Sequence, residues 1–330
     1  MRRIKYQKAT GWQTASATLA ANKLSRPIAG GSDLLGWIKD DVQGVNEPRW
    51  QTLVDIRSIS GSDRIEVSDK RLTLGSLATL HAIETSPDIQ KRYPLLAKAA
   101  GAAASPNIRN VGTIGGNVNQ RPRCWYLRNE EFDCYKKGGK FCFAVTGKNE
   151  FHAILDGELC YIVHPSDMAP ALMALHAEAV IQSLGKEQVV PFDKYFIGPR
   201  EDVLRENVLK QGDLLKEIRI PAPATGTGQS FIKAQRRGST YDFAVTSVAT
   251  AITKKDGKAD DVSIVLSGVA PTPYRATAAE TVLKGKAITL DLAREAANQT
   301  LLKARPMTEN TYKVAVAKNL IVRSVMEAFA

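Results

Sequence analysis

The stretch Asn110-Val111-Gly112-Thr113-Ile114-Gly115-Gly116-Asn117 is rich in glycine and is hard to explain as a plain turn. A second glycine run, Ala29-Gly30-Gly31-Ser32-Asp33-Leu34, lies between a predicted strand and a predicted helix. Glycine lets a backbone approach a ligand closely, and consecutive N–H groups attract anions such as a pyrophosphate. Two such loops favour a dinucleotide, although an ordinary turn before a capped helix would look the same at 29–34. Neither loop matches Gly-x-Gly-x-x-Gly or the Walker pattern, which disfavours the usual NAD and ATP sites.

All four cysteines follow the 110–117 loop within one stretch of the chain: Cys124, Cys134, Cys142 and Cys160. Thiolates hold iron–sulfur clusters and structural metals. The spacing Cys-x9-Cys-x7-Cys-x17-Cys lacks the close Cys-x2-Cys pairs of most zinc sites. Spacing alone leaves four alternatives open: an iron–sulfur cluster, a four-cysteine zinc site, two disulfides, or four unrelated buried thiols. Disulfides need an oxidising compartment.

The composition is typical of a globular protein of two or three domains, with 44% hydrophobic and 24% charged residues in 330. No window approaches the roughly 18 uninterrupted apolar residues of a membrane span. Residues 1–6 are basic but precede neither the apolar core nor the cleavage site of a signal peptide. We therefore expect a cytoplasmic protein, or a periplasmic one if a partner carries the export signal.

The formal net charge of +11 raises the question of nucleic acid binding. Lysine and arginine are spread along the whole chain, and aromatic residues do not alternate with them as in a single-strand-binding surface. The pattern favours a solvated basic surface or, next, an acidic protein partner whose docking the charge would speed. We expect no nucleic acid partner.

The apolar pattern and the turn signals divide the chain into three regions. Residues 1–57 predict a strand leading into the 29–34 loop, a helix near 34–38 and a buried strand at 52–56. Residues 58–222 are expected to contain a hairpin at 64–75 and helices at 77–83 and 95–104. Residues 223–330 are expected to open with a turn at 224–228, followed by strands at 230–234 and 263–266, a segment at 243–252 that suits strand or helix, and helices at 275–284, 290–304 and 308–330.

A series of short motifs runs through nearly the whole chain. They include the 29–34 loop and Asn107-Ile108-Arg109-Asn110, which leads into Thr113-Ile114-Gly115-Gly116-Asn117. The others are Leu72-Thr73-Leu74-Gly75, Pro165-Ser166-Asp167-Met168-Ala169-Pro170-Ala171-Leu172, Phe231-Ile232-Lys233, Tyr241-Asp242-Phe243-Ala244 and Gly268-Val269-Ala270-Pro271-Thr272-Pro273-Tyr274-Arg275-Ala276. In this order they resemble the FAD-binding subunit of the molybdenum hydroxylases, the xanthine dehydrogenase and carbon monoxide dehydrogenase family. The resemblance implies an α+β fold: a two-part FAD-binding domain of the vanillyl-alcohol-oxidase (PCMH) type, then a small α+β C-terminal domain with an antiparallel sheet and helices. The three regions are then FAD-binding subdomain 1, FAD-binding subdomain 2 and the C-terminal flavoprotein domain.

The separation between Asn117 and Ser166 departs from most of that family, in which only a short segment joins the two motifs. Here residues 118–165 intervene and hold every cysteine. The arrangement resembles a subset, the periplasmic-type aldehyde oxidoreductases and the 4-hydroxybenzoyl-CoA reductases, in which an insertion carries a [4Fe–4S] cluster. Arg121-Pro122-Arg123-Cys124 and His164-Pro165-Ser166-Asp167 are similar to the aldehyde oxidoreductase type. The resemblance therefore implies that Cys124, Cys134, Cys142 and Cys160 are cluster ligands in an insertion at about 120–163.

The same resemblance implies the residues that contact FAD. The 29–34 loop would hold the pyrophosphate, the 113–117 loop would meet phosphates and ribityl chain, and Asp167 would accept hydrogen bonds from hydroxyl groups. Leu215 and Lys233 match positions near the two ring systems; Asp167 as a helix cap and Lys233 as a solvated strand residue are the ordinary alternatives. The full expected set is Ile28, Ala29, Gly30, Gly31, Ser32, Asp33, Leu34, Thr113, Gly116, Asn117, Asp167, Leu215 and Lys233.

The function implied is that of the medium subunit of a heterotrimeric molybdenum hydroxylase. A large molybdenum-cofactor subunit would oxidise the substrate, and electrons would pass through a small [2Fe–2S] subunit to FAD and on to an external acceptor. No catalytic residue is expected in this chain, because its four histidines are scattered and the flavin carries the chemistry. The alternatives are a 4-hydroxybenzoyl-CoA-reductase-like subunit with reversed electron flow, a self-sufficient flavin enzyme, and a non-catalytic scaffold held by a four-cysteine metal site.

Overall fold

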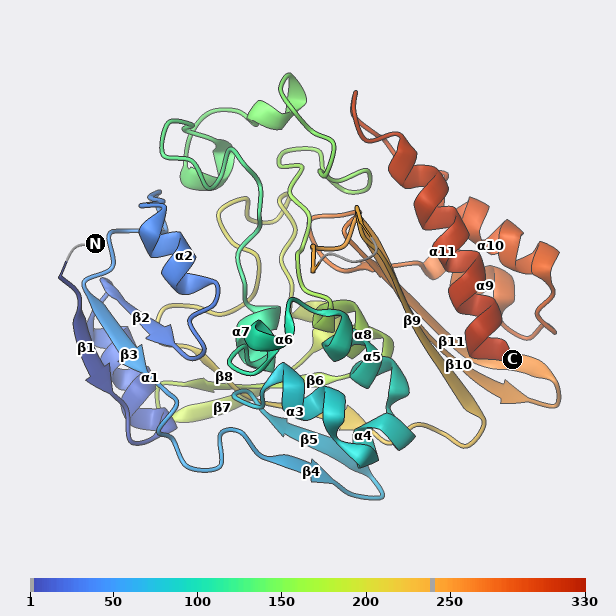
Figure 1. The fold of residues 1–330 in the computed structure, drawn as a ribbon, viewed down its shortest axis with the longest axis horizontal. Helices are drawn as coiled ribbons and strands as arrows, with labels where there is room; N and C mark the ends of the chain where they lie inside the picture. Colours follow the sequence, from blue (N-terminus) through green and yellow to red (C-terminus); the bar gives the residue numbers. More distant parts are fainter. Residues whose placement is uncertain (1–2, 238–240) are drawn as a thin grey trace.

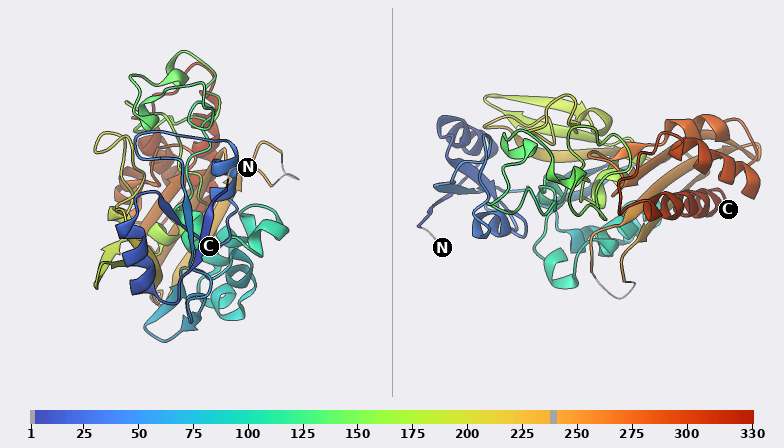
Figure 2. Two further views of the ribbon diagram at one scale, coloured as in Figure 1. Left: turned by 90° about the vertical axis from the view of Figure 1, so that its left-hand side faces the viewer. Right: turned by 90° about the horizontal axis from the view of Figure 1, so that it is seen from above.

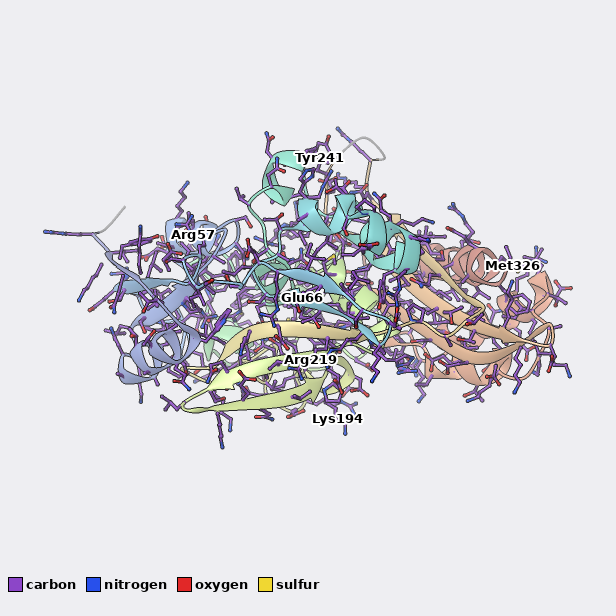
Figure 3. The ribbon with its side chains drawn as sticks, turned by 90° about the horizontal axis from the view of Figure 1, so that it is seen from below. Arg57, Glu66, Lys194, Arg219, Tyr241 and Met326 are labelled. Atoms are coloured by element: carbon purple, nitrogen blue, oxygen red, sulfur yellow. The ribbon has the colours of Figure 1, made fainter. Side chains whose placement is uncertain are left out.

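The computed structural model describes residues 3–237 and 241–330, which form an elongated molecule with three sheets (Figures 1 and 2). A parallel three-stranded sheet lies at one end, a four-stranded sheet with its helices lies at the other, and a five-stranded sheet lies between them (Figures 2 and 3). Mixed helices and sheets confirm the expected α+β class. None of the helices in the described ranges is long and apolar enough to span a membrane.

The N-terminal sheet has the order β1-β3-β2, with both neighbours parallel to β3. Its elements are β1 (Lys5–Lys8), α1 (Trp12–Ala21), β2 (Ser25–Ile28), α2 (Leu34–Lys39) and β3 (Thr52–Asp55). Successive side chains of a strand point to opposite faces, so Val54 packs with α1 while Leu53 packs with the α2 side. The strand, helix and strand expected here are confirmed. The sequence analysis missed β1, because every residue of this strand is exposed and none is apolar at alternate positions.

The middle sheet has the order β4-β5-β8-β6-β7, with antiparallel neighbours throughout. The elements of this region are β4 (Ile65–Val67), β5 (Arg71–Gly75), α3 (Leu80–Thr85), α4 (Pro87–Arg92), α5 (Pro94–Ala102), α6 (Pro106–Arg109), α7 (Ile114–Val118), α8 (Met168–Ala174), β6 (Glu178–Ser183), β7 (Lys186–Pro191), η3 (Phe192–Lys194) and β8 (Leu214–Pro221). The β4–β5 hairpin is confirmed. The helix expected at 77–83 begins only at Leu80, because Thr79 is its N-cap and accepts a hydrogen bond from the Ala82 N–H.

The cysteine segment, residues 120–163, protrudes beyond α2 and the N-terminal end of α11 (green, Figure 1). Its only helical turns are η1 (Tyr135–Lys137) and η2 (Phe143–Val145). The rest consists of turns and irregular backbone. Regular hydrogen bonding therefore does not hold this segment, and side chains must satisfy much of its backbone.

The C-terminal region forms an antiparallel sheet of order β12-β11-β10-β9. Its elements are β9 (Thr227–Ala234), β10 (Thr246–Lys255), β11 (Lys258–Ser267), β12 (Tyr274–Arg275), α9 (Thr277–Leu283), α10 (Leu290–Leu301) and α11 (Tyr312–Phe329). The three helices cover one face, while the other face shares a hydrophobic core with α5, α8 and the middle sheet (Figure 1). The 243–252 segment is a strand from Thr246, because β10 is hydrogen bonded on both sides. The turn expected at 224–228 is shorter, since β9 starts at Thr227.

Candidate functional site

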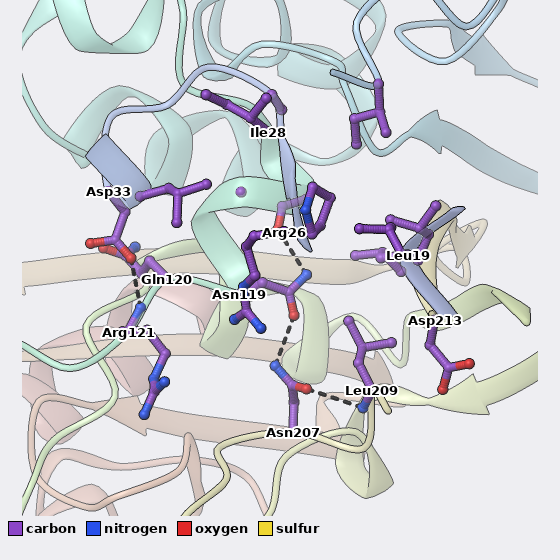
Figure 4. A pocket seen from close by; sticks show the side chains of 18 of the residues that line it. Leu19, Arg26, Ile28, Asp33, Asn119, Gln120, Arg121, Asn207, Leu209 and Asp213 are labelled. Atoms are coloured by element: carbon purple, nitrogen blue, oxygen red, sulfur yellow. Dashed lines mark hydrogen bonds between the residues drawn. The ribbon is translucent and has the colours of Figure 1, made fainter. Parts of the chain in front are cut away.

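A cavity of about 580 Å³ lies between the N-terminal sheet and the middle sheet (Figure 4). It is lined mainly by three segments that are far apart in sequence: 25–34, 113–121 and 204–215. The whole 28–34 run, Thr113, Gly116 and Leu215 are among the lining residues. Asn117, Asp167 and Lys233 are not. The structure thus brings most of the expected FAD-binding residues to one cavity and places three elsewhere.

The two glycine loops pack backbone against backbone. A Cβ atom on Gly30 would lie 1.9 Å from the carbonyl oxygen of Val111, so only glycine fits at this crossing. Gly31 has φ +71° and forms the turn itself. Gly115 donates its N–H to the Ser76 carbonyl at 2.8 Å, and a Cβ there would also collide with that oxygen. The glycines are therefore needed to assemble the cavity as well as to admit a ligand.

Thr113 and Asn117 hold the short helix α7 in place. The Thr113 hydroxyl accepts the Gly116 N–H at 3.1 Å, and this cap leaves its O–H free to donate. The Asn117 side chain accepts a 2.6 Å hydrogen bond from the Ser166 hydroxyl. That hydroxyl in turn accepts the Ala169 N–H at 2.9 Å, so Ser166 caps α8.

Asp167 does not act as the helix cap that the sequence left open as an alternative. Its Oδ2 atom pairs with Lys233 Nζ at 2.7 Å, and Lys233 also donates to the Ala102 carbonyl at 2.8 Å. Burial raises the pKa of Asp167, against the opposing effect of Lys233. The Oδ1 atom is buried and has no hydrogen-bond partner among the described residues. Lys233 is likewise no solvated strand residue, since its side chain is 5% exposed.

The carboxylate of Asp33 is committed to the cysteine segment. It accepts the backbone N–H of Arg121 at 2.8 Å and pairs with the guanidinium groups of Arg128 at 2.6 Å and Arg123 at 2.8 Å. Asp33 therefore lines the cavity while fastening the cysteine segment to the start of α2. Sequence reasoning gave no sign of this, because the three arginines lie far along the chain.

Several cavity residues were not expected from the sequence. Asn119 accepts hydrogen bonds from the Tyr195 hydroxyl at 2.8 Å and from the Asn207 amide at 2.9 Å, as Figure 4 shows for Asn207. Arg121 is 9% exposed, packs over the ring of Trp37 and pairs with Glu47 and Glu206. Burial alone would lower the pKa of Arg121, but these carboxylates outweigh it and the pKa is raised. Glu206 and Asn207 come from a polar loop that contains no motif or residue spacing typical of a ligand site.

The four cysteines line a second, small cavity together with Lys136, Phe143 and His152. All four are free thiols, so the structure does not contain the two disulfides that the sequence left open as an alternative. Backbone N–H groups of the next residues point at three of the sulfur atoms: Tyr126 and Leu127 at Cys124, Lys136 and Lys137 at Cys134, and Ile162 at Cys160. Such hydrogen bonds to sulfur accompany thiolate ligands of iron–sulfur clusters.

Burial determines the protonation of the thiols in the small cavity. Burial raises the pKa of Cys124 and of Cys160 to about 12, so both are neutral without a cation. His152 lies with Nε2 3.3 Å from the sulfur of Cys124, and burial lowers its pKa to about 4. Across residues 3–237 and 241–330, no group of three or more His, Cys, Asp or Glu side chains is arranged to hold a metal ion.

Five aromatic residues of the cysteine segment divide into two groups. Tyr126 and Phe143 line the small cavity, and Phe132 packs on both at ring distances of 5.0 Å. Trp125 and Phe141 are about half exposed. Only the first group therefore covers the small cavity.

Comparison with known proteins gives consistent matches along the chain. Residues 2–223 match the family described as FAD binding domain in molybdopterin dehydrogenase, and residues 229–328 match the CO dehydrogenase flavoprotein C-terminal domain. The aldehyde oxidoreductase FAD-binding subunit PaoB of Escherichia coli (strain K12) is 32% identical, with 96% of each chain covered. The carbon monoxide dehydrogenase medium chain of Hydrogenophaga pseudoflava is 28% identical over 92% of this chain and 88% of that one. A solved structure of the Hydrogenophaga pseudoflava carbon monoxide dehydrogenase superposes with a TM-score of 0.77 at 27% identity, covering 99% of this chain and 98% of that chain.

Proposed function

Since the chain belongs to the FAD-binding medium subunits of the molybdenum hydroxylases, we propose that it carries FAD and a [4Fe–4S] cluster in a heterotrimer of that family. In this role it takes up electrons from a small [2Fe–2S] subunit and delivers them to an external acceptor, while a large molybdenum-cofactor subunit oxidises the substrate. The similarity to PaoB favours an aldehyde as that substrate. The compartment is that of the large and small subunits: cytoplasmic, or periplasmic if one of them carries an export signal.

The cavity that both glycine loops line is the observation that carries the flavin part of the proposal. The 28–34 run supplies backbone N–H groups for the pyrophosphate, and Thr113 and Gly116 meet the phosphates or the ribityl chain. Asp167 has a buried oxygen without a partner, which suits a ribityl or ribose hydroxyl, and Asn117 and Lys233 hold the groups around it. Leu215 offers apolar surface to a ring. When bound, FAD supplies the redox centre that these residues only bind and orient.

The four thiols around one small cavity support the cluster part of the proposal. A tetrahedral zinc ion with Zn–S distances of about 2.3 Å would bring its four sulfur atoms within about 4 Å of each other. Four thiols around one cavity, with backbone N–H groups aimed at three of them, also suit a cluster of several iron atoms. The proposed ligands are Cys124, Cys134, Cys142 and Cys160.

We place the domain boundaries of this proposal at 1–57, 58–222 and 223–330. The first two regions contribute opposite walls of the flavin cavity, since the 28–34 run comes from one and the 113–121 and 204–215 segments from the other. The third region supplies Lys233.

Iron, zinc, acid-labile sulfide and flavin contents of the anaerobically purified chain test the proposal. About four iron and four sulfide per FAD are expected, and Cys134→Ser should lose both iron and sulfide while keeping the flavin. FAD with zinc would give the cysteines a structural role. A folded chain with a metal but no flavin would favour a scaffold, and one with neither flavin nor iron would overturn the proposal. Reduction of bound FAD by a substrate in the isolated chain would instead indicate a self-sufficient flavin enzyme.

A further inference from the structure

Three buried charged side chains connect the flavin cavity with the cysteine cavity. Arg121 and Glu206 line the first cavity, and Lys136 lines the second. Arg121 Nε lies 2.8 Å from one carboxylate oxygen of Glu206, and Lys136 Nζ lies 3.0 Å from the other. The three side chains are between 2% and 9% exposed. Glu206 is therefore shared between a residue of each site.

The side chain of Lys136 fixes the loop that forms one wall of the flavin cavity. An ammonium group has three donors. Besides Glu206, that of Lys136 contacts the carbonyl oxygens of Val203 at 2.8 Å and Arg205 at 3.2 Å. Its charge pairs with Glu206 and two of its donors bond to carbonyl oxygens of the same loop, of which residues 204–207 line the flavin cavity.

The position of Lys136 depends in turn on the cysteines. Lys136 belongs to η1, which starts directly after Cys134, and its backbone N–H is one of those aimed at the Cys134 sulfur. Lys136 also lines the small cavity together with Cys160, which places it beside a second thiol. A centre that binds both thiolates would hold η1, and with it the ammonium group, in one place.

The network cannot be rearranged one residue at a time at low cost. Burial alone would raise the pKa of Glu206, but Arg121 and Lys136 outweigh it and lower that pKa. Removing one member of a buried charge group leaves its partners uncompensated, which costs far more than an exposed ion pair contributes. The three side chains are therefore expected to keep or lose their positions together.

We propose that Lys136 and Glu206 are positioning residues that couple the two sites, so that a metal centre held by the cysteines tightens flavin binding. This inference rests on the proposed function, because it needs both groups to bind. Coupling between sites is reciprocal, and bound flavin therefore also stabilises the metal centre. Arg121 completes the connection on the flavin side.

The test is the dissociation constant of FAD for the full-length chain, measured anaerobically by calorimetric titration with the iron centre intact and after its removal by a chelator. FAD should bind about tenfold more weakly to the iron-free chain, within the range usual for coupled sites. Cys134→Ser provides an independent iron-free form that should give the same dissociation constant. Iron should also be lost to the chelator faster from the flavin-free chain than from the flavin-bound one.

The ratio of the two dissociation constants identifies the carriers of the coupling. In Glu206→Gln and in Lys136→Met it should fall close to one, whereas a merely structural defect would weaken FAD binding in both states and leave the ratio unchanged. Glu84→Gln is the matched control, because Glu84 also pairs with a mostly buried arginine, Arg109 at 2.8 Å, and lines neither cavity. Its ratio should stay near ten.

Equal dissociation constants in the unsubstituted chain would overturn the coupling, whether or not the variants fold. An unchanged ratio in Glu206→Gln and Lys136→Met would overturn the assignment to these residues. A chain that binds FAD but no iron would overturn the proposed cluster and the coupling with it, and the metal analysis distinguishes that result from a failure of the coupling alone.

Discussion

The flavin cavity and the cysteine cavity are built in opposite ways. Backbone forms the first: glycines bring two of its three lining segments together beside regular strands and helices, and side chains fill in around them. Side chains form the second: four thiols converge from one segment with only two short helical turns. A cavity made of backbone is sensitive to a single added Cβ. A cavity made of side chains on irregular backbone depends on what holds that backbone from outside.

The cysteine segment is held from three directions. Asp33 fastens its start to α2, and Lys136 fastens its middle to the 203–206 loop. Its end is held by α11 and the residues before it: Asn310 and Lys313 donate to the carbonyl oxygen of His152 at 3.1 and 2.9 Å. In each case a polar side chain satisfies backbone groups that no sheet or helix satisfies.

Gly30→Ala should break the flavin cavity and is the change with the largest expected effect. The added Cβ would lie 1.9 Å from the Val111 carbonyl oxygen, and no side-chain rotation relieves an overlap between two backbones. We expect loss of FAD binding and a fall of at least about 4 kcal/mol in the free energy of unfolding. Denaturant unfolding and flavin content after purification measure both.

Gly36→Ala is the control for that substitution, since a Cβ on Gly36 meets no atom within 4 Å and the residue lies within α2. It should be neutral or stabilising by about 0.5–1 kcal/mol. If Gly30→Ala bound FAD like the unsubstituted chain, backbone packing would not be what builds this cavity.

Lys313→Met should destabilise the cysteine segment near its C-terminal end, where Lys313 bonds to the backbone. Lys313 is fully buried, burial lowers its pKa to about 7, and it donates to the carbonyl oxygens of Phe151, His152 and Gly268. Methionine fills similar space but leaves three acceptors without this donor, at a cost of about 3–4 kcal/mol in the free energy of unfolding. The same substitution at the exposed Lys303 should change stability by less than about 0.5 kcal/mol. Thermal unfolding of the two variants compares them, and equal melting temperatures would contradict this role of Lys313.

The same contrast explains what the sequence could and could not reveal. Periodic apolar residues located β3, the β4–β5 hairpin, α10 and α11, and the glycine runs located the two loops that do meet. The contacts of Asp33, Lys136 and Glu206 had no such signal, because a buried ion pair between distant segments looks in sequence like any charged surface residue. The clustering of the cysteines indicated a metal centre, but the residues that hold the segment lie outside it.

His164 tests the junction between the two regions, where the cysteine segment rejoins the chain before α8. It is 2% exposed, packs against the ring of Phe196 at 4.7 Å, and burial lowers its pKa from 6.5 to about 4. Between pH 4 and 6.5 the unfolded chain therefore binds a proton that the native chain does not. The free energy of unfolding must then fall as the pH falls through this window, by at most about 3 kcal/mol from this group.

Urea unfolding at pH 7 and pH 5 measures the dependence. His164→Gln should reduce the difference between the two pH values, since the substituted side chain does not titrate. His81→Gln, at a side chain that is 53% exposed, should leave it unchanged. Identical pH dependence in both variants would mean that His164 carries no proton-linked stability.

Thr113→Ala has the smallest expected effect on stability, and it separates helix capping from ligand binding at the flavin cavity. The Thr113 hydroxyl caps α7 by accepting the Gly116 N–H at 3.1 Å, and Thr289 caps α10 in the same way by accepting the Leu292 N–H at 3.2 Å. Loss of either cap should cost about 1 kcal/mol in the free energy of unfolding. Only Thr113 lines the flavin cavity, so only Thr113→Ala should also weaken FAD binding, and Thr289→Ala should leave it unchanged. Calorimetric titration of both variants with FAD separates the two roles, because equal FAD affinities would restrict Thr113 to capping, with the backbone alone holding the ligand.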